Sequence, residues 1–468
     1  MKRPNIIFIM SDDHAAHAMS CYGSRINTTP HLDRIAAGGM RLDNCFCTNS
    51  ICAPSRATIL TGTYNHVNGV TTLATHLDNR QVMFPELLQR QGYQTALVGK
   101  WHLGQGSAHE PRGFDFWRVL PGQGLYHNPE MIDADGKRVW EGYVTDLITD
   151  MSLDWLRGRD KDKPFCLCVH HKAPHRHWEP DDKHAHMYDD VDIPEPETFW
   201  DDYSDRGSHA EAVTMRVDRD MKEIDWKAPP PEGLSAAEFK RWAYQRYIKD
   251  YLRVIASIDD NTGRLLDYLD DEGLTDDTMV IYTSDQGFFL GDHGWYDKRL
   301  MYEESLRMPF IVRYPREIEA GSICDDIALN VDFAPTFLDL ADAPVPESFQ
   351  GRSLRPIFRG ETPADWQTSM YYRYWMHNDG AHHVPAHYGL RTRRYKLIYY
   401  YNDPCGQPGA NDPAGEPEWE LFDLQEDPCE LHSVYHDPAY AAIVVELKDE
   451  LHRRQAVVGD ERYPADGA

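Results

Sequence analysis

The sequence has no apolar run long enough to cross a membrane and few basic residues for its size. A spanning helix needs about 18 consecutive apolar residues, and no such stretch occurs among the 468 residues. Asp and Glu number 76 against 48 Lys and Arg, for a formal net charge of −28. Because basic surface supplies most of the affinity for nucleic acid, this charge argues against a nucleic-acid partner. It also argues against long polyanions, unless one face is locally basic.

The nine cysteines are odd in number and lack the spacing of a disulfide scaffold, so we expect mostly free thiols in a reducing compartment. The first apolar run, Ile6 to Met10, is too short for a secretory signal and is soon followed by two aspartates. We therefore expect a cytoplasmic protein from the sequence as given, or a periplasmic or secreted one if a signal has been removed.

Four short apolar runs each end in polar residues. They are NIIFIM before Ser11–His14, TALVG before Lys100–His102, FCLCV before His170–His175, and MVIYT before Ser284–Gly287. Continuous apolar runs of this length are typical of strands buried on both faces of a mostly parallel sheet.

Helical patterns lie between these runs, as in TTPHLDRIAAGG, where Thr29 is a candidate N-cap and Pro30 the first helical residue. Alternating strands and helices predict an α/β fold with a large, mixed but mostly parallel sheet flanked by helices. Ligands of such sheets bind beyond the carboxyl ends of the strands. We expect this domain to occupy residues 1–360. A smaller C-terminal α+β domain with a small antiparallel sheet, residues 361–468, is expected after the proline-rich approach APVPESFQGRSLRPIF.

Carboxylates follow two of the predicted strands: Asp12 and Asp13 after one, Asp285 with the amide of Gln286 after another. Three carboxylates and an amide oxygen are ligands that Ca²⁺ or Mg²⁺ prefers. Without a cation they would repel one another and raise their own pKa values. Asp12 and Asp13 alone would fit a solvated turn, so the metal prediction depends on the second pair.

Residues 51–56 read ICAPSR, ahead of ATILTG. An early proline and Gly62 predict a short helix from Pro54 to Thr61, with Cys52 at its N-terminal mouth. That mouth favours an anion and a reactive thiol. Two alternatives are a buried, inert Cys52 and a zinc site with Cys45 and Cys47, for which no fourth ligand has finger-like spacing.

Six histidines lie within HHKAPHRHWEPDDKHAHM, residues 170–187. A polar loop with scattered imidazoles accounts for His184 and His186, whereas His175 follows the strand end more directly. Lys100 lies between a buried strand and Trp101, unlike an ordinary surface lysine. Lys298 by itself would fit a surface position.

Five segments together resemble the type I sulfatases, the formylglycine-dependent branch of the alkaline phosphatase superfamily. CAPSRATILTG matches their C-x-P-x-R signature, and GYQTALVGKWHLG, residues 92–104, matches the second signature. SDD and SDQG match the metal-binding segments, and GDHGWYDKRLMYEESLRMPFIVRYP resembles the segment that carries a second active-site lysine. The tail YKLIYY…WELFDLQEDPCEL resembles the family's C-terminal domain. An alkaline-phosphatase-like fold is therefore implied.

The resemblance also implies a chemistry for Cys52. In the family, a formylglycine-generating enzyme oxidises this cysteine to an aldehyde, which is then hydrated. One hydroxyl of the hydrate attacks sulfur, and loss of a proton from the other expels sulfate by elimination.

Site roles follow from the matched positions. The metal ligands would be Asp12, Asp13, Asp285, Gln286 and the residue derived from Cys52; the other catalytic residues would be Arg56, which holds the formylglycine, the sulfate-binding Lys100 and Lys298, the base His102 and the candidate acid His175. Many relatives carry Asn where Gln286 stands. Ca²⁺ is the expected cation, with Mg²⁺ or Mn²⁺ as alternatives.

The implied activity is hydrolysis of a small sulfate monoester of a sugar or an aryl alcohol. YYRYWMHNDGAHHVPAHYGLRT resembles the substrate-side loop of sulfatases that act on sulfated amino sugars, which makes His382, His383 and His387 candidate substrate contacts. Alternatively, these histidines merely decorate a loop. Two rival functions are a phosphonate monoester or phosphodiester hydrolase that uses the same formylglycine, and a binding protein that has lost catalysis.

Overall fold

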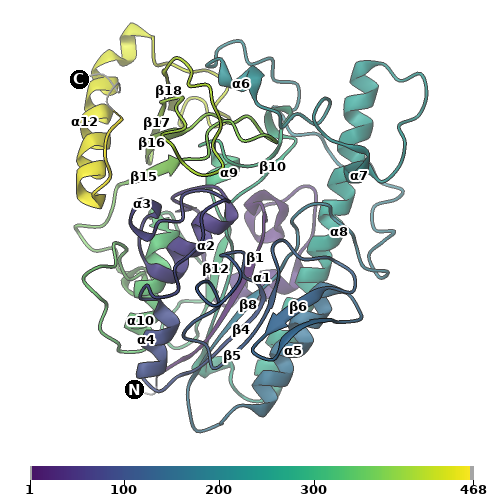
Figure 1. Ribbon diagram of the computed structural model, residues 1–468, viewed down its shortest axis with the longest axis vertical. Helices are drawn as coiled ribbons and strands as arrows, with labels where there is room; N and C mark the ends of the chain where they lie inside the picture. Colours follow the sequence, from purple (N-terminus) through teal and green to yellow (C-terminus); the bar gives the residue numbers. More distant parts are fainter. Residues whose placement is uncertain (1–2, 464–468) are drawn as a thin grey trace.

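The computed structural model describes residues 3–463 and is built on a ten-stranded sheet (Figure 1). The sheet order is β13-β2-β12-β9-β1-β8-β4-β5-β6-β7. The four predicted apolar runs form its centre as parallel neighbours: β1 (Asn5–Ser11), β4 (Gln94–Lys100), β8 (Phe165–His170) and β9 (Thr278–Ser284). Outer strands are β2 (Met40–Leu42), β5 (Phe116–Leu120), β6 (Glu130–Asp133), β7 (Gly136–Val139), β12 (Phe310–Arg313) and β13 (Ser322–Cys324). Antiparallel pairing of β12, β6 and β7 makes the sheet mixed, as expected.

Helices cover both faces of the sheet because successive side chains of a strand point to opposite sides. On one face, Ile7 and Ile9 pack with α1 (Pro30–Ala37), α5 (Val144–Gly158) and the long α8 (Ala236–Asp271). On the other, Phe8 and Met10 pack with α2 (Cys52–Thr61), α4 (Phe84–Arg90) and α10 (Phe333–Leu340). The two helical layers therefore bury the central strands, with only Gln94 at the start of β4 partly exposed.

Two predicted helix starts need correction. The Thr29 side chain does not cap α1, because its hydroxyl bonds to Ser20; the carboxylate of Asp259 in α8 accepts the N–H groups of His31 and Leu32 instead. Helix α2 begins at Cys52 rather than at Pro54, so the cysteine occupies the first helical position. Its predicted end is confirmed, since Gly62 follows in the left-handed conformation with φ 62°.

A separate antiparallel sheet forms the C-terminal part of the chain. Its strands, in spatial order, are β15 (Ser369–Tyr374), β16 (His387–Thr392), β17 (Tyr395–Tyr400) and β18 (Glu418–Asp423). Helix α12 (Ala441–Val458) packs against it (Figure 1). Apolar residues of this sheet belong to the same hydrophobic core as Phe8 and Met10, so the boundary at residue 360 stays a prediction.

The remaining strands and α-helices are short. They are β3 (Cys45–Phe46), β10 (Phe289–Leu290), β11 (Tyr296–Asp297), β14 (Ala328–Leu329), α3 (Asn65–Asn68), α6 (His209–Ala212), α7 (Glu223–Trp226), α9 (Glu303–Leu306) and α11 (Arg355–Phe358). Within residues 3–463, none of the helices combines the length and the apolar character that a membrane crossing requires. All nine cysteines are unpaired thiols, as the sequence predicts.

Candidate active site

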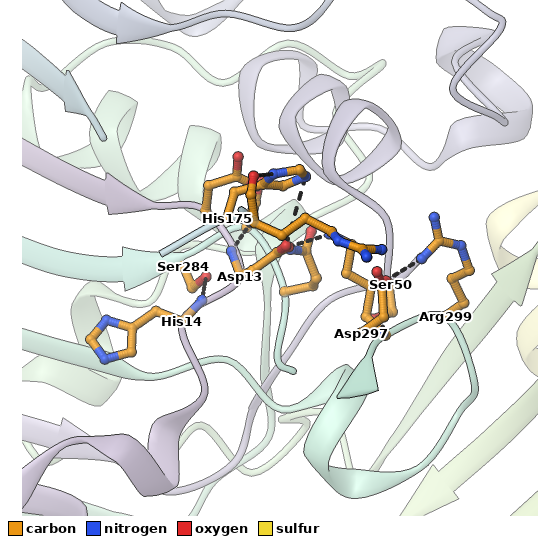
Figure 2. Close-up of polar contacts among 12 residues, drawn as sticks. Asp13, His14, Ser50, His175, Ser284, Asp297 and Arg299 are labelled. Atoms are coloured by element: carbon orange, nitrogen blue, oxygen red, sulfur yellow. Dashed lines mark hydrogen bonds and ion pairs between the residues drawn. The ribbon is translucent and has the colours of Figure 1, made fainter. Parts of the chain in front are cut away.

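Polar side chains meet where the central strands end, at one edge of the large sheet. Asp12 and Asp13 follow β1, Lys100 ends β4, and Asp285 with Gln286 follows β9; each is at most 1% exposed. The backbone N–H of Asp13 donates to Oδ1 of Asp285 at 3.2 Å, which ties two strand ends together. Figure 2 shows Asp13 beside His175, with the Asp297–Arg299 pair next to them.

The site holds three carboxylates and three cations from distant parts of the chain. The pairs are Asp12 with Lys100, Asp13 with Lys298, and Asp285 with Arg56, whose Nε lies 2.8 Å from Oδ2. Arg56 also donates from an Nη to the backbone oxygen of Lys100 at 3.0 Å. In this state the formal charges of the three pairs cancel.

Cys52 lies at the first position of α2 and is 1% exposed. Burial raises the pKa of its thiol, while the positive charges of Lys100 and Lys298 act in the opposite direction. The same two lysines that pair with the aspartates thus act electrostatically on the thiol. A thiol whose pKa is raised is a weak nucleophile, so the unmodified side chain is poorly suited to attack.

The residues present fit a hard cation. Oδ1 of Asp12 and Oε1 of Gln286 are buried and have no hydrogen-bond partner. Ligand atoms of Asp12, Asp13 and His175 lie within 4.8 Å of one another. Burial, together with the neighbouring carboxylates, raises the pKa of Asp13 to about 7 and that of Asp285 to about 6. Crowded, unpartnered oxygens of this kind are what a divalent cation neutralises.

The two predicted histidines reach the same site from different strand ends. His102 has φ 59°, and burial together with the charge of Lys100 holds its pKa well below the usual range. Nδ1 of His175 lies 2.8 Å from the carbonyl oxygen of Arg176, and Nε2 lies 3.8 Å from Oδ2 of Asp13. Burial lowers the pKa of His175 as well. Both imidazoles are therefore neutral near pH 7 and able to accept a proton.

The three predicted substrate histidines do not share a surface. His382 lies next to the loop that carries Lys298, called the lysine loop below, with Nε2 3.3 Å from Oδ2 of Asp297. His383 is exposed and contacts the hydroxyl of Thr214 at 3.0 Å. His387 is 0% exposed and packs among tyrosine rings of the C-terminal sheet. A fully buried ring has no surface for a sugar, so we withdraw His387 from the substrate-contact set.

Sequence reasoning missed several residues of this region. Asp297 and Arg299 flank Lys298, and Asp379 lies in the same C-terminal segment as His382. The two segments that resemble sulfatase motifs therefore already contained these three residues. Lys172, in the predicted histidine cluster, is 4% exposed, and burial lowers its pKa to about 8. Gln123, whose amide oxygen contacts Lys100, had no signal in the sequence.

Two family models match the chain over most of its length. The model of the sulfatase family matches residues 4–343, and that of the N-sulphoglucosamine sulphohydrolase C-terminal region matches residues 291–457. The chain belongs to the sulfatase family. It is a sulfuric ester hydrolase, and the resemblance found in its sequence is confirmed.

Similar proteins cover nearly all of this sulfatase. An N-acetylglucosamine-6-O-sulfatase from Bacteroides thetaiotaomicron is 44% identical over 97% of the chain and 86% of that protein. A solved structure of a protein in complex with its substrate D-glucosamine-2-N,6-O-disulfate is 42% identical, with a TM-score of 0.91 and full coverage of both chains. A phosphonate monoester hydrolase from Silicibacter pomeroyi superposes with a TM-score of 0.75 over 97% of this chain and 95% of its own, at 22% identity. At 22% identity, the similarity to the phosphonate monoester hydrolase shows only that the two proteins share a fold. The predicted fold and sulfatase activity are confirmed, and the phosphonate alternative has less support.

Proposed function

We propose that this sulfatase removes sulfate from the 6-oxygen of a glucosamine-type sugar. A sequence match named for this activity, at 44% identity, and a solved structure bound to a 2-N,6-O-disulfated glucosamine, at 42% identity, support the substrate class. The observation that carries the proposal is the buried cluster of Arg56, Lys100 and Lys298 with three aspartates at the strand ends, which Arg56 ties to the helix that begins with Cys52. A divalent cation added to the balanced pairs brings the pocket to about +2, which suits a single sulfate ester.

Cys52, converted to formylglycine, would be the nucleophile. The hydrated aldehyde supplies one hydroxyl to attack sulfur and a second whose deprotonation releases the sulfate. The first-turn N–H groups of α2 favour negative charge at this position. Arg56 contacts both Asp285 and the Lys100 backbone, and so fixes the relation between the helix and two strand ends.

Asp12, Asp13, Asp285 and Gln286, with the oxygen of residue 52, would hold Ca²⁺. When bound, the cation lowers the pKa of a coordinated hydroxyl and offsets the charge of the sulfate. Because Ca²⁺ prefers oxygen ligands, the nitrogen of His175 is left to face the leaving group. The negative charge of a bound sulfate ester favours the protonated imidazole, and His175 would then give its proton to the sugar oxygen.

Lys100 and Lys298 would bind the sulfate oxygens once the cation neutralises Asp12 and Asp13, their present partners. His102 would take the proton in the elimination step, since its imidazole is neutral at pH 7 and its Nδ1 is buried without a partner. His383, which is exposed and follows His382, would contact the sugar.

The test is kcat/KM of protein co-expressed with a formylglycine-generating enzyme, measured on glucosamine sulfated at O6 and on its O3-sulfated isomer. We expect a clear preference for the O6 ester. Equal rates, or a preference for the O3 isomer, would overturn the assignment. An aryl phosphonate monoester tests the rival activity in the same assay.

Substrate size can be tested separately. The whole chain carries −28, so a sulfated polymer would be repelled outside the pocket, most strongly at low salt. We expect a sulfated monosaccharide to be a better substrate than intact heparin. A preference for heparin that strengthens as salt falls would contradict action on small esters.

A further inference from the structure

The loop that carries Lys298 has an unusual backbone. Asp297 and Arg299, on either side of the lysine, have φ values of 78° and 96°, in the region that favours glycine. Residues other than glycine persist there only where the surrounding structure enforces the conformation. Lys298 itself is 2% exposed and points at Asp13. Something must therefore hold this loop in its strained form.

A closed ring of four side chains includes the two strained residues. Arg299 contacts Asp297 through Nη1, and its Nε lies 3.6 Å from Oδ2 of Asp379. His382 closes the ring, with Nδ1 2.8 Å from Oδ1 of Asp379 and Nε2 3.3 Å from Oδ2 of Asp297. The other oxygen of Asp297 accepts the backbone N–H of Lys298 at 2.9 Å. The ring thus reaches the lysine backbone directly.

The ring joins two parts of the chain that are far apart in sequence. Asp297 ends β11, whereas Asp379 and His382 lie between β15 and β16 of the C-terminal sheet. All four ring members are at most 9% exposed. Separating one partner from such a buried set would leave an uncompensated charge, which is energetically costly. The four side chains are therefore held in this arrangement.

Tyr372 of β15 adds a second connection from the same sheet. Its hydroxyl donates to the carbonyl oxygen of Arg299 at 2.7 Å and accepts the N–H of Ser50 at 3.1 Å. Ser50 stands two residues before Cys52, so the buried side chain of Tyr372 links the lysine loop to the N-terminus of α2.

We propose that Asp379 and His382 are positioning residues, through which the C-terminal sheet holds Lys298 in place to bind the reacting sulfate. The proposal rests on the function proposed above. It assigns His382 a task different from the sugar contact expected from the sequence. Both ring nitrogens of His382 already face carboxylates, which leaves neither free for a hydroxyl of the substrate.

The two roles predict different dependence on the leaving group. A positioning residue acts on the binding of the sulfate group, which every substrate carries. Its loss therefore lowers kcat for a sulfated sugar and for p-nitrophenyl sulfate by the same factor. A sugar contact affects only the sugar ester, mainly through KM. A displacement of about 1 Å in a catalytic group can cost on the order of 100-fold in rate.

The experiment measures both substrates with His382→Ala, Asp379→Asn and the conservative His382→Gln in the matured, metal-loaded enzyme. We expect losses of about 10- to 100-fold on both substrates with an unchanged ratio. Because glutamine can still donate to Asp297, His382→Gln should retain more activity than His382→Ala. A loss confined to the sugar substrate, or none on either, would overturn the proposal.

A matched control and a double mutant distinguish a loss that acts through Lys298 from a loss caused by misfolding. Asp423→Asn also changes a buried C-terminal aspartate paired with an arginine, Arg394, at 2.7 Å, and should leave both activities unchanged. His382→Ala placed on Lys298→Met should cost nothing further if His382 acts through Lys298; an additive loss contradicts that route. Wild-type enzyme inactive on the sugar but active on the aryl ester would refute the proposed substrate, while the aryl arm still tests the positioning.

Discussion

Replacing Arg56 by methionine should destabilise the protein by an amount that depends on the bound cation. The side chain is 2% exposed, and its Nε pairs with Oδ2 of Asp285 at 2.8 Å. Methionine keeps most of the volume but leaves Asp285 buried with one cation fewer. Loss of one partner of a buried ion pair costs about 3–5 kcal/mol.

The structure favours the lower end of that range. After the substitution, Asp285 still accepts the N–H of Asp13 at 3.2 Å, and the Lys100 carbonyl oxygen still has Nδ1 of His170 at 3.2 Å. Neither group is left without a partner, so we expect a loss of about 3 kcal/mol in the metal-free protein. A bound divalent cation supplies Asp285 with a new counter-charge, and the loss should fall to about 1 kcal/mol.

Urea unfolding of wild type and variant, each in EDTA and in excess Ca²⁺, measures both values. Arg393→Met is the matched control, because that arginine is 55% exposed and pairs with Asp326 at 2.7 Å; it should cost less than about 1 kcal/mol in either buffer. A loss below 1 kcal/mol for Arg56→Met in EDTA, or one that does not change with Ca²⁺, would refute the reasoning.

Three further predictions concern the nucleophile, the metal and an ion pair outside the site. Intact mass after co-expression with the maturing enzyme should fall by about 18 Da at Cys52, and Cys52→Ala should be inactive; residual turnover by that variant would exclude the mechanism. Elemental analysis should find about one Ca²⁺ or Mg²⁺ per chain and much less in Asp12→Ala, whereas stoichiometric zinc would contradict an oxygen site. Hydrogen bonds from Arg355, opposed by partial burial, lower the pKa of Glu317 from 4.5 to about 2, so its contribution is present above about pH 4.5 and lost as pH falls toward 2. Glu317→Gln should therefore cost about 1 kcal/mol at pH 7 after screening, and unfolding curves that show the same cost at pH 3 would contradict this sign.

The sequence by itself determined the central strands and the chemistry at their ends. Each run such as NIIFIM is apolar throughout, because burial on both faces leaves no polar side to encode. The carboxyl ends of parallel strands meet at one edge, so the convergence of Asp12, Lys100 and Asp285 could be predicted without knowing any distance. The end of α2 was also readable, since a left-handed residue there favours glycine.

Only the tertiary structure decided which groups pair and which are buried. Asp259 caps a helix more than 220 residues away in sequence, His387 faces the core rather than a substrate, and Asp379 with His382 closes on the lysine loop. These outcomes depend on contacts between elements far apart in the chain, which no local pattern of residues records. Local propensity sets where a strand or helix forms, but the environment of a charge is set by whatever the folded chain brings against it.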